Sequence, residues 1–129
     1  MKKLDSNGQT LVALIIYMVV AMTITLAAVA VTIINVRANN SYTSGELALQ
    51  YAHDGVENAM IQLERNASYT GETMSIGSGS ATITVSGTTT RTLTSVGTVA
   101  GIGSYKRTVV VTATYSGNAF TVTNWIETP

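Results

Sequence analysis

The chain has 129 residues, seven basic and seven acidic side chains, a formal net charge of zero and no cysteine. Balanced charge without a basic patch gives no electrostatic reason to expect nucleic acid binding. The absence of cysteine excludes disulfides and zinc–thiolate sites, and the single histidine, His53, cannot form a multi-histidine metal site. We recognise no set of nucleophile, base and orienting residue, so the sequence predicts no enzyme, no cofactor and no metal.

An uncharged apolar block occupies much of the N-terminal third. No charged residue occurs from Gln9 to Val36, and from Leu11 onward the block is mainly Ala, Val, Leu, Ile and Met. This exceeds the roughly 20 residues that cross a bilayer core as a helix. Because backbone groups in lipid need partners within their own segment, a lone span must be helical. We predict a transmembrane helix over residues 9–38, with hydroxyls bonded to backbone carbonyls four residues earlier at Thr10, Thr23, Thr25 and Thr32.

The flanking charges give this helix an orientation. Lys2 and Lys3 precede it, Arg37 follows it, and no further charge occurs until Glu46. Basic residues are retained on the cytoplasmic side, so the bias mildly favours a cytoplasmic N-terminus. The sequence therefore predicts a single-pass protein of the inner or cytoplasmic membrane, with most of the chain outside.

Helical periodicity continues beyond the membrane segment. Small or apolar residues recur at steps of three and four between Glu46 and Arg65: Ala48, Ala52, Gly55, Val56, Ala59 and Leu63. We interpret His53, Asp54 and Glu57 as solvated polar positions rather than as a metal or acid–base site. Residues 39–65 are thus predicted to form a distal amphipathic helix. The weak helix formers in Asn39–Gly45 favour a kink or a melted turn there.

The remainder, residues 66–129, is predicted to be a β-rich extracytoplasmic domain. Asn66–Gly79 is rich in Gly, Ser and Thr and indicates a loop. Four segments then alternate apolar and polar residues, at 81–85, 93–99, 109–115 and 120–126. Ser116–Asn118 is a tight hairpin signal. We predict an α+β fold with about four antiparallel strands, mostly a meander, whose apolar face is covered by the distal helix and whose threonine-rich face is wet.

The N-terminal motif carries the sharpest functional signal. A short basic leader, Met1–Gly8, ends in glycine directly before the apolar helix, which starts Gln9, Thr10, Leu11, Val12, Ala13, Leu14. This resembles the class III signal of type IV pilins and pseudopilins. The resemblance implies that a prepilin peptidase cuts after Gly8 and leaves Gln9 as the new N-terminus, open to methylation. It also implies that residues 10–14 take part in assembly. Gly45–Ala59 further resembles the stretch after the membrane helix in minor pilins.

The resemblance implies a structural role. The chain would be a subunit of a type IV pilus or a related filament, stored in the membrane and then assembled into an extracellular pilus or a periplasmic pseudopilus. Its partners would be other pilin-like subunits, the prepilin peptidase, an assembly platform in the membrane, and lipid. Two residues depart from the family pattern: Gln9 stands where phenylalanine is usual, and Ala13 where most members have glutamate. The missing carboxylate favours a minor or specialised subunit.

One other interpretation stays open. Leu11–Val36 also fits a plain signal anchor. On that basis the chain would be a monomeric, single-pass, membrane-anchored binding module that holds a ligand or partner with its β domain. An intact Met1–Gly8 leader in a host that has a prepilin peptidase would favour this alternative.

Cleavage between Gly8 and Gln9 is the first testable prediction. Replacing Gly8 with leucine puts a bulky side chain at the proposed cleavage junction, so Gly8→Leu is expected to remain an uncut precursor when co-expressed with a prepilin peptidase. Mass spectrometry of the N-terminus, with the unaltered chain as control, measures the outcome. Normal processing of Gly8→Leu would count against the signal.

Overall fold

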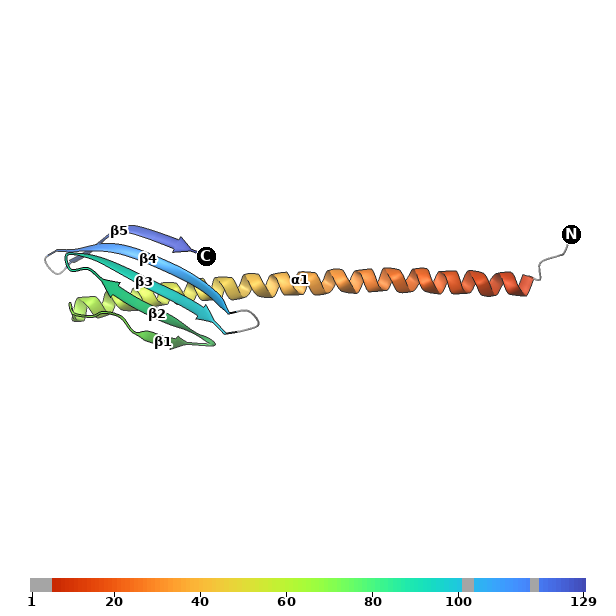
Figure 1. Ribbon diagram of the computed structural model, residues 1–129, viewed down its shortest axis with the longest axis horizontal. Helices are drawn as coiled ribbons and strands as arrows, with labels where there is room; N and C mark the ends of the chain where they lie inside the picture. Colours follow the sequence, from red (N-terminus) through yellow and green to blue (C-terminus); the bar gives the residue numbers. More distant parts are fainter. Residues whose placement is uncertain (1–5, 101–103, 117–118) are drawn as a thin grey trace. The chain divides into compact units, whose positions relative to one another are not determined.

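A computed structural model describes residues 6–100, 104–116 and 119–129 (Figure 1). Helix α1 is followed by five strands, with these bounds: α1 Ser6–Arg65, β1 Thr73–Ile76, β2 Gly79–Ser86, β3 Thr90–Val99, β4 Tyr105–Ser116 and β5 Ala119–Thr128. The chain divides into two compact units between Asn40 and Ser41. The α+β fold predicted from the sequence is confirmed.

Helix α1 contributes to both units. Its bounds contain the helix predicted from the apolar block and from the periodicity that follows it. Residues 39–45 are helical as well, so the expected melted turn is absent there. Weak intrinsic preference is therefore overridden at these positions.

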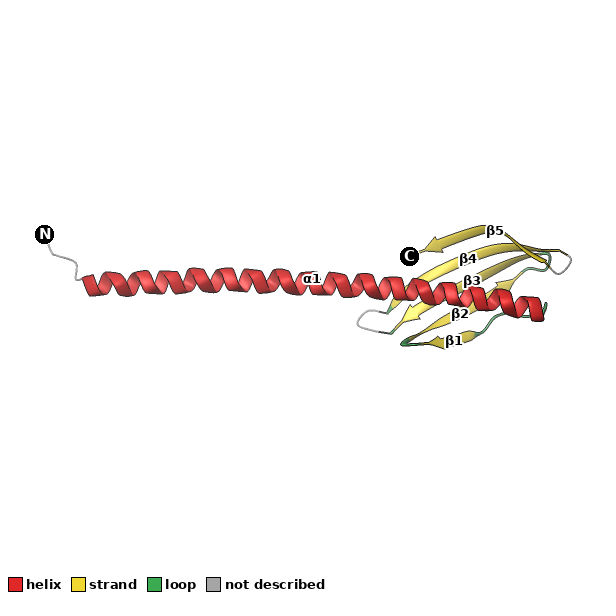
Figure 2. Ribbon diagram, turned by 180° about the vertical axis from the view of Figure 1, so that it is seen from behind, coloured by secondary structure: helices red, strands yellow, loops and turns green. Residues whose placement is uncertain are grey.

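The strands form one antiparallel sheet in the order β1-β2-β3-β4-β5, so the predicted meander is confirmed (Figure 2). The strand count of about four and the loop over Asn66–Gly79 are corrected, because β1 lies within that range and pairs with β2 from Thr73↔Thr82 to Ile76↔Gly79. This strand is four residues long, and only Met74 and Ile76 are apolar in it. So short an alternation is too weak to recognise among Gly, Ser and Thr, yet both side chains pack against the core.

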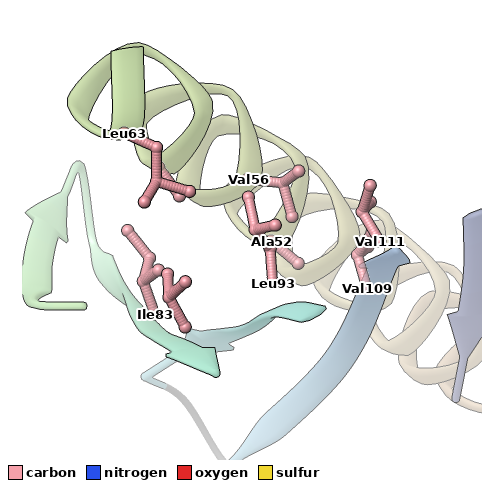
Figure 3. Packing of buried hydrophobic residues seen from close by; sticks show 9 residues of the cluster. Ala52, Val56, Leu63, Ile83, Leu93, Val109 and Val111 are labelled. Carbon is pink, nitrogen blue, oxygen red and sulfur yellow. The ribbon is translucent and has the colours of Figure 1, made fainter. Parts of the chain in front are cut away.

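The core of the second unit lies between α1 and the sheet (Figure 3). The predicted helical stripe is buried, with Ala48, Ala52, Val56 and Ala59 fully inaccessible and Leu63 1% exposed. It meets side chains from β2, β3 and β4, namely Ile83, Val85, Leu93, Val109 and Val111. Complete burial of one Val or Leu side chain contributes about 1.5–3 kcal/mol, so this contact is the main stabilising element of the unit.

Two glycines set how closely α1 approaches the sheet. A Cβ on Gly55 would overlap Ser95 Oγ and lie 3.0 Å from Ala81 Cβ. On the sheet side, a Cβ on Gly97 would overlap the carbonyl oxygen of Ala48. The missing side chains allow backbone-to-backbone contact. The Ser95 hydroxyl, fully buried in this contact, has no hydrogen-bond partner among the residues that the structure describes.

The connection after α1 is held by polar contacts. Asn58 Nδ2 and the Tyr69 hydroxyl both donate to Glu72 Oε1, at 2.8 and 3.1 Å. Burial, together with the hydrogen bond to Glu72, raises the pKa of Tyr69 to about 12. The phenol therefore remains a donor across the physiological pH range. Arg91 Nη2 also donates to the carbonyl oxygen of Ala67 at 2.6 Å.

The close helix–sheet contact predicts opposite outcomes for two helical glycines. Gly55→Ala is expected to lower the free energy of unfolding by about 1–3 kcal/mol, because the added methyl overpacks the core. Gly45→Ala is the matched control. Its Cβ would meet only the Arg107 side chain, at 3.6 Å, and alanine improves helix propensity by ~1 kcal/mol.

Thermal unfolding of the full chain in detergent, followed by circular dichroism, measures both effects. The double variant Gly55→Ala/Ser95→Ala should recover part of the loss, because it removes the Oγ atom that the new methyl would overlap. Equal stability of Gly55→Ala and Gly45→Ala would show that the close approach is not needed.

Candidate membrane and assembly surface

The first unit presents an apolar surface that its own residues do not cover. The large apolar side chains from Leu11 to Val36 are between 48% exposed, at Ile33, and 74% exposed, at Tyr17. By length and composition, α1 is able to cross a membrane. An apolar surface of this extent requires an apolar environment, supplied either by lipid or by other protein.

The threonines of this surface do not make it polar. Thr25 Oγ1 donates to the carbonyl oxygen of Ala21 at 2.8 Å, and Thr32 Oγ1 donates to that of Ala28 at 2.9 Å. Both bonds are those predicted from the sequence. Thr23 Oγ1 instead donates three residues back, to Val20, at 2.8 Å. With these hydroxyls bonded inside the helix, its surroundings need not supply partners for them.

The predicted processing and assembly residues follow one another in the first turns of α1. Gly8 and Gln9 are helical, and a Cβ placed on Gly8 would meet nothing within 4 Å. Residues 1–5 of the expected leader lie outside the described residues. From Thr10 to Leu14 every residue is exposed. The small side chain of Ala13 contributes to a shallow notch, lined also by Thr10, Leu11 and Leu14.

A polar cluster that the sequence did not reveal joins α1 to β5 within the second unit. His53 Nε2 lies 3.0 Å from Glu127 Oε1, and Trp125 Nε1 donates to the same oxygen at 3.3 Å. The His53 and Trp125 rings meet edge to face, with centroids 5.4 Å apart. The His53 side chain is 35% exposed and so keeps contact with solvent, but its ring also has a carboxylate and an aromatic neighbour that the sequence did not indicate.

This cluster does not form a metal centre. It holds one histidine and one carboxylate, and no group of three or more His, Asp or Glu side chains suited to a metal occurs in the described part of the chain. No local sequence pattern indicates the contact of His53 with Glu127, because the two residues are 74 positions apart in the chain. Its evident structural effect is to fasten β5 to the helix.

Comparisons of the chain with protein-family models, with curated proteins and with solved structures found no match. What the chain does is therefore inferred from its residues and their geometry. Among the surfaces of the described residues, the apolar face of residues 11–36 is the most extensive candidate for a functional contact.

Proposed function

We propose that this chain is a structural subunit, minor or specialised, of a type IV pilus or a related pilin-like filament. The observation that carries the proposal is the exposed apolar segment of α1 that follows Gly8, at the place where the leader resembles a class III signal. The leader explains how the helix is processed, and the exposed surface explains why it needs neighbours.

Storage and assembly would use the same surface. In the membrane, residues 11–36 contact lipid. In a filament, equivalent helices replace the lipid, so little apolar area is returned to water and the hydrophobic cost of extraction is largely offset. Small side chains let helices approach closely where lipid offers no competing hydrophobic gain, as at Ala21, Ala27, Ala28 and Ala30. The internally bonded threonines suit both environments.

The second unit would form the outer part of the filament. Its own core is closed by the helical stripe, whereas the sheet face away from α1 carries threonines at alternate positions, such as Thr82 and Thr84 on β2. A polar face of this kind is compatible with water. The proposed orientation places the N-terminus of the stored protein in the cytoplasm.

The alternative is a monomeric, membrane-anchored binding module. It is favoured by the same observation, since one apolar helix is sufficient for anchoring. The two functions differ in where the processed protein is found. The test expresses the chain with a prepilin peptidase, an assembly platform and pilin-like partners, then shears the cells and analyses the released filaments by mass spectrometry and imaging.

The proposal expects chains that begin at Gln9 in the sheared filaments. Retention of the chain in the membrane with Met1–Gly8 intact would contradict the proposal and support the anchor. A chain that is cut after Gly8 yet stays out of every filament would also contradict it.

Ala13 generates a prediction about partners. The family resemblance implies that a carboxylate at this position pairs with the terminal amine of a neighbouring subunit, and alanine cannot supply that charge. The helix packing that remains is less specific about how neighbouring subunits are aligned along the filament axis. The chain is therefore expected to enter filaments efficiently only together with other pilin-like subunits.

Two variants sharpen this test. Ala13→Glu restores a carboxylate, which is costly in lipid unless paired, and is expected to increase the amount of filament made by this chain alone. Ala13→Gln is the uncharged control of similar size and should not. Imaging of sheared filaments gives the yield. Long filaments formed by the unaltered chain alone would refute partner dependence.

A further inference from the structure

Strand β5 forms a long, open edge of the sheet. It has ten residues and is hydrogen-bonded to β4 on one side, whereas the opposite edge, β1, has four. Figure 2 shows these two strands at the two margins of the sheet. Val122, Trp125 and Ile126 are 46%, 39% and 49% exposed. A long apolar edge is a template for pairing with another strand.

A bulge interrupts β5 near its middle. Val122 lies opposite Ala113 and Asn124 lies opposite Thr112, so Thr123 is an extra residue in β5. Thr123 Oγ1 donates to the carbonyl oxygen of Thr112 at 3.0 Å. One extra residue shifts the alternation of side chains between the two faces by one position.

Because of this shift, residues at equal distances before and after the bulge lie on the same face of the sheet. On the face that carries the helix, Val122 precedes the bulge and Trp125 follows it, opposite the buried residues Ala113 and Val111. Farther out on this face, Phe120 lies opposite Tyr115 and Glu127 lies opposite the buried Val109. On the other face, Thr121 precedes the bulge and Ile126 follows it.

This arrangement makes β5 complementary to itself. Two copies running antiparallel, related by a twofold axis between Thr123 and Asn124, would set Val122 opposite Trp125, Phe120 opposite Glu127 and Thr121 opposite Ile126. Every pair shares a face, as cross-strand neighbours must. Without the extra residue, pairing about the same point would join residues from opposite faces, because alternation has a period of two.

The bulge also favours a second β5 as the strand that pairs with this edge. A bulge on an edge strand deters pairing with a straight strand, but a second β5 carries the same bulge at the same place. Glu127 is the single charged residue of β5 and would meet Phe120, so no like charges would face each other. Val122 and Trp125 would form two equivalent apolar pairs.

We propose that β5 is a self-pairing edge that joins two copies of this chain, antiparallel, into one continuous sheet. The pairing reverses the strand direction in the second copy, which suits subunits of two filaments lying side by side. This consequence rests on the proposed function. A single edge contact is modest, but repetition along two filaments would multiply it through effective concentration.

The absence of native cysteine makes the register directly testable. Full-length Thr121→Cys and Ile126→Cys proteins are purified in detergent, mixed and mildly oxidised. The mixture is expected to form a disulfide-linked dimer, because the register places these residues opposite each other. Neither protein alone should form this dimer. Two cysteines at the same position in the two copies would be roughly 15 Å apart, beyond the ~7 Å between Cα atoms that a disulfide tolerates.

A matched control uses the same strand and the same face. Thr121→Cys mixed with Ala119→Cys should give no dimer, because the register separates these positions by roughly 20 Å or more. Adding Val122→Asp to both partners of the productive pair should reduce the dimer at least several-fold, since two carboxylates would then face the apolar Trp125 side chains. Circular dichroism verifies that this variant keeps its fold.

Each outcome decides the proposal. Failure of the Thr121/Ile126 mixture to cross-link would overturn it and leave β5 to an unrelated strand or to solvent. Equal yield from the Thr121/Ala119 mixture would also overturn it, because random collision would then explain the dimer. The assay needs neither leader processing nor a filament, so its result is independent of the test of the proposed function.

Discussion

The apolar side chains of residues 11–36 are about half exposed or more, and no described residue of the first unit covers them. Because water does not tolerate so large an apolar surface, this segment requires lipid or other protein around it. The helix has no charge from Gln9 to Val36, and the hydroxyls of Thr23, Thr25 and Thr32 bond internally. An environment that excludes water is thus what this segment of the helix requires.

The same helix meets a different requirement beyond Ser41. There the sheet buries one stripe of small and apolar residues, Ala48–Leu63, while Tyr42 and Ile61 on other sides of the helix stay exposed. Gly55 and Gly97 make the contact close enough to exclude larger side chains on both surfaces. The apolar side chains in the first part of the helix are therefore shielded from water by its surroundings, and those of the stripe in its second part by the sheet. The threonine-rich face and β5 stay available for contacts outside the unit.

Periodicity was sufficient to predict the features that repeat. The long apolar block, the stripe from Ala48 to Leu63 and most of the sheet follow from spacing in the sequence. Strand β1 was missed because two apolar residues do not define a period. The contact of His53 with Glu127 and the bulge at Thr123 depend on which strands become neighbours, and no local pattern carries that information. The functional meaning of the leader, and of alanine at position 13 where pilins usually have glutamate, is inferred from the sequence alone and stays a prediction.

The central claim, that residues 11–36 lie in an apolar environment both in the membrane and in the proposed filament, is most directly tested by cysteine labelling. Ala21→Cys and Ala28→Cys are exposed to a membrane-impermeant maleimide in intact membranes and in sheared filaments, with Thr84→Cys on the polar sheet face as the accessible reference. The account predicts that both helix positions stay unlabelled in both preparations while position 84 reacts. Labelling of positions 21 and 28 at the rate of position 84, in either preparation, would contradict it.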